Sequence, residues 1–193
     1  MQVDLPSAAE EPRILDDVSG ETARPDLKTI FDEHADHVGV SLRRLGVRAA
    51  DVPDLVQDVF VVVHRILPDY DPSRPMWPWL FGILYRTAAA YRRKTGREVL
   101  DDGTVADARA DSTKNIDEAI RKQEERALVL EALEHVDFTR RAVFVMAEID
   151  GVPVPEVAEA LGIGLNTAYS LLRLAREDFR AAVKRLAKQR GMR

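Results

Sequence analysis

Apolar side chains recur at intervals of three and four residues along most of this 193-residue chain. That spacing gathers them on one face of an α-helix, whereas a half-buried strand would need alternating apolar and polar residues, which are nearly absent. The sequence therefore predicts an all-α fold. Apolar residue types make up 46% of the chain, enough to form packed cores at this length.

The helical patterns fall into two groups separated by an acidic stretch. The first group is predicted at 26–46, 51–67 and about 77–94, with Gly46 ending the first helix and Asp51 capping the second. The second group begins near residue 116. Residues 98–115 are rich in Asp and lack an apolar stripe, which predicts a flexible linker. The expected architecture is two small, compact helical domains joined by that linker.

Charge is distributed unevenly along the chain. The net charge is −5, yet 86–97 contains only basic charges and 165–193 is strongly basic, while 98–118 is mainly acidic. The chain has no Cys, which excludes disulfides and thiolate sites. The first 25 residues lack the basic start and apolar run of a signal peptide, and no apolar stretch approaches the roughly 18 residues of a membrane span. We therefore expect a cytoplasmic protein without membrane insertion.

The stretch EVAEALGIGLNTAYSLLRLARE, 156–177, has the spacing of a helix-turn-helix. A short helix leads to Gly162, and a second helix runs from Leu165 to about Val183. An ordinary helical hairpin has similar spacing and is the alternative. On the exposed side, the residues placed to read base edges are Asn166, Thr167, Tyr169, Ser170 and Arg173, and those placed toward phosphates are Arg176 and Arg180.

The second helix of this motif carries few basic residues among the positions placed toward DNA. Affinity for DNA depends largely on how many phosphates basic side chains neutralise. The motif alone therefore predicts weak binding to DNA. A second DNA-binding surface or a partner protein is expected to hold it in place.

Two segments together resemble a known family. The segment DVPDLVQDVFVVVHRILPDYDPSRPMWPWLFGILYRTAAAYRRK, 51–94, resembles the second conserved region of bacterial sigma factors. The segment TRRAVFVMAEIDGVPVPEVAEALGIGLNTAYSLLRLARE, 139–177, resembles the fourth. The lack of domains between them is similar to the extracytoplasmic-function (ECF) group. The resemblance implies a promoter-specificity subunit of RNA polymerase with no catalytic activity of its own.

The resemblance also implies a domain order. It comprises a disordered tail at 1–25, a region 2 domain at 26–97, an acidic linker at 98–117, a region 4 domain at 118–187 and a basic tail at 188–193. The implied partners are core RNA polymerase, promoter DNA and an anti-sigma factor. In the family the linker threads through polymerase toward the RNA exit path; a soluble tether is the plain alternative.

Roles for individual residues follow from the same resemblance. The helix containing DLVQDVF would dock on polymerase, with Asp54, Gln57 and Asp58 as the contact face and Leu55 and Phe60 mainly packing; a merely solvated face is the alternative. The loop YDPSRP and the following MWPWLF would capture an extruded base of the −10 element. Its candidates are Tyr70, Asp71, Ser73, Arg74 and Trp77, with phosphate contacts from Arg86, Arg92, Arg93 and Lys94, whereas Trp79 is expected to pack the domain.

Two positions depart from the family pattern. Tyr169 and Leu171 stand where the family often has basic residues, so the preference for a −35 sequence cannot be transferred to this chain.

Other classes of function find little support. His34 and His37 lie three residues apart, but no third metal ligand is identifiable, and no phosphate-cradling loop or catalytic group stands out. We expect no metal, no cofactor and no enzymatic activity. The remaining alternatives are a sigma-like decoy that sequesters an anti-sigma factor and a stand-alone helix-turn-helix regulator, which is usually a dimer.

Overall fold

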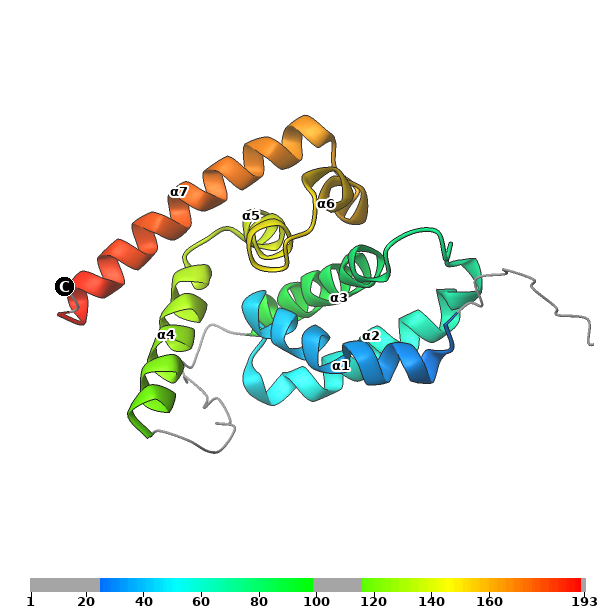
Figure 1. Ribbon diagram of the computed structural model, residues 1–193, viewed down its shortest axis with the longest axis horizontal. Coiled ribbons are helices and arrows are strands. Elements are labelled where there is room, and N and C mark those ends of the chain that lie inside the picture. Colours follow the sequence, from blue (N-terminus) through cyan, green and yellow to red (C-terminus); the bar gives the residue numbers. More distant parts are fainter. Residues whose placement is uncertain (1–24, 99–115, 192–193) are drawn as a thin grey trace, which may run out of the picture.

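The computed structural model describes residues 25–98 and 116–191, and within these ranges every regular element is helical (Figure 1). The all-α prediction is confirmed. The predicted N-terminal tail and nearly all of the acidic linker lie outside the described residues. The helices are α1 (Leu27–Arg44), α2 (Val52–Ile66), α3 (Met76–Glu98), α4 (Ile116–Glu134), α5 (Phe138–Phe144), α6 (Val154–Leu161) and α7 (Leu165–Gln189).

Helices α1, α2 and α3 pack together as an N-terminal domain. The carboxylate of Asp26 accepts the Thr29 N–H at 2.6 Å and so begins α1. Gly46 ends α1 as predicted, because its φ of 89° suits a residue without Cβ. Asp51 occupies the N-cap position of α2, but its carboxylate accepts from Arg48 at 2.8 Å and Tyr91 at 2.5 Å instead of capping the helix.

The C-terminal domain contains α4 to α7 and includes the helix-turn-helix. Gly162 stands between α6 and α7 in the left-handed region, with φ 68°, and lets the Ile163 N–H donate to the Ala158 carbonyl at 2.9 Å. Helix α7 runs to Gln189 rather than to about Val183. The extra turns are stabilised because Ala182 and Leu186 pack against Ala132 of α4.

The sequence had suggested a separate core for each of the two domains. The structure instead shows one core that the two domains share. Buried apolar residues of α3 and of the C-terminal domain join in one cluster, which includes Phe81, Leu84, Met146 and Val157. The cause lies in α3, where residues 80–84 are buried without a break. A helix that is apolar all round must be covered on every side. In Figure 1, α5 and α6 cover the side of α3 that faces away from α1 and α2.

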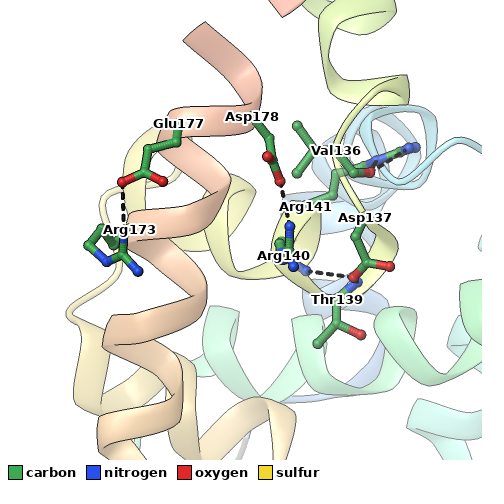
Figure 2. A network of polar contacts seen from close by, with 8 residues as sticks. All are labelled: Val136, Asp137, Thr139, Arg140, Arg141, Arg173, Glu177 and Asp178. Carbon is green, nitrogen blue, oxygen red and sulfur yellow. Dashed lines mark hydrogen bonds and ion pairs between the residues drawn. The ribbon is translucent and has the colours of Figure 1, made fainter. Parts of the chain in front are cut away.

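Arg141 of α5 is a charged residue inside this packing, with 3% of its surface exposed. Its Nη2 donates to the carbonyl oxygens of Glu134 and Val136, each at 3.0 Å, where α4 ends. Figure 2 shows the contact with Val136. Burial, and then the neighbouring Arg92, lower the pKa of Arg141 to about 10. The guanidinium therefore keeps its charge at neutral pH, and its hydrogen bonds offset part of the cost of desolvation.

We predict that Arg141→Lys lowers the free energy of unfolding by about 1–3 kcal/mol, because a single ammonium cannot reproduce the fork of donors and leaves a buried carbonyl unpaired. Urea unfolding of the full chain measures the loss. The matched control is Arg140→Lys. Arg140 pairs with Asp178 at 2.8 Å near the surface, so this change should cost less than about 1 kcal/mol. Equal losses in the two variants would contradict a special role for the buried guanidinium.

Candidate nucleic-acid interface

The outer face of α7 presents all seven residues predicted to contact the −35 element. They are exposed side chains: Asn166, Thr167, Tyr169, Ser170, Arg173, Arg176 and Arg180. Tyr169 is 53% exposed although it is a large aromatic residue. The opposite face is buried through Ala168, Leu172 and Ala175, as predicted. Helix α7 is therefore held by packing on one side and free to contact DNA along the other.

Acidic groups of the same domain pair with two arginines on this face. Arg173 donates to Glu177 at 2.7 Å (Figure 2), and Arg176 donates to Glu148 of the π-helical turn η3 (Val145–Ile149) at 2.5 Å. Exposed ion pairs of this kind contribute at most about 1 kcal/mol. Both pairs are therefore weak enough for another anion, such as a phosphate, to replace the acidic partner at little cost.

The loop before α3 is held by its own side chains. The carboxylate of Asp71 accepts the Ser73 N–H at 3.0 Å and the Ser73 hydroxyl at 2.7 Å, which lowers the pKa of Asp71. Tyr70 is 5% exposed, packs against Trp79 and donates its hydroxyl to the Arg74 carbonyl at 2.5 Å. The interpretation of Tyr70 as a stacking platform for DNA therefore does not fit this conformation, in which its ring supports the loop from beneath.

Trp77 is the first aromatic residue after this loop and lies half-buried in α3. Its ring stacks on His37 of α1 with centroids 3.6 Å apart and an interplanar angle of 8°. His34 lies one turn earlier on the same ring, at 6.2 Å. The spacing of three that had suggested metal ligation therefore places both imidazoles against Trp77.

Basic residues line α3 beyond this point. Arg86, Arg93 and Lys94 are exposed, as a phosphate contact requires. Arg92 is exposed as well, and its guanidinium lies over the ring of Phe138 of α5, 4.8 Å from the centroid.

The face predicted to contact polymerase lies on α2. Asp54, Gln57 and Asp58 are exposed, while Leu55 and Phe60 are buried, with Phe60 against Phe31. The sequence interpretation missed Val61, which is 53% exposed on the same face as the three polar residues. Its position three residues after Asp58 was the available signal, but it lies in an apolar run that suggested burial.

Asp150 was also missed. It lies in the turn after η3, and its carboxylate accepts from Trp77 Nε1 and Arg44 Nη1, each at 3.1 Å, and faces His37 Nε2 at 3.3 Å. The Asp-Gly pair signalled the turn, but nothing in the sequence connected Asp150 with partners 73 to 113 positions away.

Comparisons with known proteins support the assignment of the two regions. The model of sigma-70 region 2 matches residues 30–98, and that of sigma-70 region 4 matches residues 126–179. RNA polymerase sigma factor CnrH of Cupriavidus metallidurans is 31% identical over 155 residues, covering 77% of this chain and 81% of CnrH. The ECF RNA polymerase sigma-E factor of Escherichia coli is 25% identical over 149 residues, covering 73% and 78%.

The chain belongs to the sigma-70 family. Its relatives include named ECF sigma factors, and its function is that of a sigma factor in transcription initiation.

Solved structures of relatives share the fold of this sigma factor. CnrH in complex with the cytosolic domain of CnrY superposes with a TM-score of 0.60 at 26% identity, covering 82% of this chain and 87% of CnrH. The sigma factor RpoE of Bartonella quintana, in complex with the anti-sigma factor NepR, gives the same TM-score at 20% identity. The match covers 80% of this chain and 96% of the other chain.

Among the described residues, no group of three or more His, Asp or Glu side chains is arranged to hold a metal ion. None of the helices in those residues is long and apolar enough to cross a membrane.

The exposed face of α7 leads to a prediction that separates base contacts from phosphate contacts. Arg173→Ala should change preference at one base position by about 1–3 kcal/mol, because a lost base contact removes discrimination there. Arg180→Ala should instead weaken binding to all promoters alike. It should also reduce the slope of log binding constant against log salt concentration by about 1. Binding of the holoenzyme to a promoter library at several salt concentrations measures both effects. Unchanged preference in Arg173→Ala would remove that residue from the reading face.

Proposed function

We propose that this ECF sigma factor binds core RNA polymerase through α2, reads the −35 element with α7 and opens the −10 element with the loop at 70–77. The observation that carries the proposal is the presence of two distinct candidate DNA surfaces on two domains. One is an exposed, sparsely charged helix face, and the other is a self-supported loop next to Trp77 and the basic end of α3. The protein supplies recognition and melting in the cytoplasm and has no catalytic activity of its own.

The charge on α7 explains why polymerase is needed. Only three arginines lie among the seven candidate contacts on α7, and two of them already have acidic partners. Affinity for duplex DNA grows with the number of phosphates neutralised, so this face binds weakly by itself. Docking of α2 on core polymerase keeps α7 close to the promoter. The high local concentration of α7 there compensates for its weak affinity for DNA.

The loop at 70–77 has the chemistry for holding an unpaired base. Extruding a base costs a few kcal/mol, and an aromatic platform with polar groups offsets a similar amount. Trp77 supplies the ring, and Asp71, Ser73 and Arg74 supply the exposed polar edges. Tyr70 contributes by fixing the Arg74 backbone from below.

An anti-sigma factor is the proposed regulatory partner. Support comes from the two solved relatives, since CnrH was solved with the cytosolic domain of CnrY and RpoE with the anti-sigma factor NepR.

The polymerase surface is tested by reversing charge on α2. The double change Asp54→Lys and Asp58→Lys should weaken binding to core polymerase at least about tenfold, because each reversed carboxylate turns an attraction into a repulsion at the centre of the contact. The matched control is Glu33→Lys with Asp36→Lys, which makes the same change in net charge on the exposed side of α1. Competition for core polymerase against the parent chain measures both. If the α2 variant folds and competes as well as the parent, α2 is not the contact surface.

Promoter opening is tested at Trp77. Holoenzyme carrying Trp77→Ala should form a closed complex but open it poorly, because the unpaired base loses its stacking partner, worth about 1–3 kcal/mol. Permanganate footprinting of unpaired thymines measures opening, and a premelted template should restore part of it. Trp79→Phe is the control, since Trp79 packs against Tyr70 inside the domain. Normal opening of duplex promoters by Trp77→Ala would refute the assignment.

A further inference from the structure

Helix α7 carries two exposed apolar side chains in its first two turns. Leu165 is 45% exposed and Tyr169 is 53% exposed. Leu165 is the first residue of α7, directly after the N-cap Gly164, and Tyr169 follows one turn later on the same face. Leu171 does not belong to this face, because it is half-buried and packs against the shared core. We call Leu165 and Tyr169 the apolar pair.

The side chains around the apolar pair are neutral. Asn166, Thr167 and Ser170 are exposed beside it, and no residue in 165–172 carries a charge. The Ser170 hydroxyl donates to the Asn166 carbonyl at 2.9 Å, so its proton is used within the helix. The first charged residue along α7 is Arg173. The start of α7 therefore offers apolar and amide contacts but no cation.

Basic residues further along the same face identify the occupant of this surface as DNA. Arg173, Arg176 and Arg180 are exposed and follow one another at intervals of three and four residues. Guanidinium groups bind phosphates with paired, charge-assisted hydrogen bonds. In a helix-turn-helix, the N-terminal residues of the second helix lie against base edges in the major groove. The apolar pair thus lies where bases are read, and the groups suited to phosphates lie beyond it.

The chemistry of the base pairs limits what the start of α7 can read. Guanine is recognised most often by Arg or Lys, and cytosine by the carboxylate of Asp or Glu. Residues 165–172 contain none of these four residue types. Thymine instead presents its 5-methyl group in the major groove to apolar side chains, and adenine presents a donor and an acceptor that match the amide of Asn. The start of α7 therefore matches A·T pairs.

We propose that the apolar pair reads thymine 5-methyl groups, so that the −35 element has A·T pairs where the first two turns of α7 enter the major groove. The inference rests on the proposed function for the position of α7 on DNA, and it adds which bases are chosen. The two residues are about 6 Å apart along the helix axis, comparable with the rise of two base pairs, so they reach methyl groups of neighbouring pairs. Burial of one methyl group should tighten binding about fourfold.

Deoxyuridine measures the contribution of each methyl group, because it pairs with adenine as thymine does but lacks the 5-methyl group. A promoter is first selected by the holoenzyme from a library randomised in the −35 element. Each thymine of the selected element is then replaced singly by deoxyuridine. Replacement should weaken binding of the holoenzyme about fourfold at the thymines that face the apolar pair and leave it unchanged elsewhere.

Substitutions connect each methyl group with a side chain. Tyr169→Ala should weaken binding and remove the response to deoxyuridine at one thymine, and Leu165→Ala should do the same at a neighbouring one. Tyr169→Phe keeps the ring and should keep the response. Tyr169→Arg should change the preferred pair at that position from T·A to G·C, because a guanidinium pairs with guanine. Val40→Ala on α1 is the matched control, since it shortens a similarly exposed apolar side chain and should alter neither binding nor the response.

The outcomes separate this inference from the proposed function. Circular dichroism verifies that each variant is folded. If the library shows a −35 preference but no thymine responds to deoxyuridine, or the response persists in both alanine variants, the inference is overturned and the proposed role of α7 stands. If the alanine variants instead lose affinity for core polymerase and keep the response, the apolar pair is a protein contact, which also overturns the inference. If the parent shows no −35 preference at all, the proposed role of α7 fails and the inference fails with it.

Discussion

The carboxylate of Asp150 is the contact on which the arrangement of the whole chain depends. It carries charge in a site that water barely reaches and is stabilised by Arg44, His37 and Trp77 at distances of 3.1 to 3.3 Å. The attraction between buried charges roughly balances the cost of desolvating them, so such a pair contributes specificity more than net stability. The interface also contains apolar residues of α3 and of the C-terminal domain, which are buried together in one cluster.

Helix α3 connects this contact to the loop at 70–77, the candidate for binding the −10 element. Its segment 80–84 is buried on all sides, against α1 and α2 on one side and α6 on the other. The same helix begins directly after the loop and continues into the basic residues Arg86, Arg93 and Lys94. Separating the domains therefore exposes apolar surface on α3 next to the groups that would hold single-stranded DNA.

The two candidate DNA surfaces differ in how far they are available in the free chain. The reading face of α7 is exposed, and its arginines keep only weak surface pairs with Glu177 and Glu148. In the loop proposed to open the −10 element, the Trp77 N–H is donated to Asp150 and Arg74 is ion-paired with Glu159. Aromatic residues beside basic groups bind single-stranded nucleic acid with little sequence preference, so these contacts limit such binding by the free chain.

The sequence by itself determined the local features of this protein. Helical periodicity fixed the all-α fold, Gly162 marked the turn before α7, and the spacing of apolar residues at three and four positions identified which side of α7 is exposed. Only the tertiary structure decided that Tyr70 supports the loop from inside, that Arg141 is buried at the end of α4, and that Asp150 joins the two domains. Periodicity indicates which side of a helix is buried, but it does not indicate which other helices cover that side. Contacts between residues 73 to 113 positions apart depend on shape and desolvation at surfaces that exist only after the helices have packed.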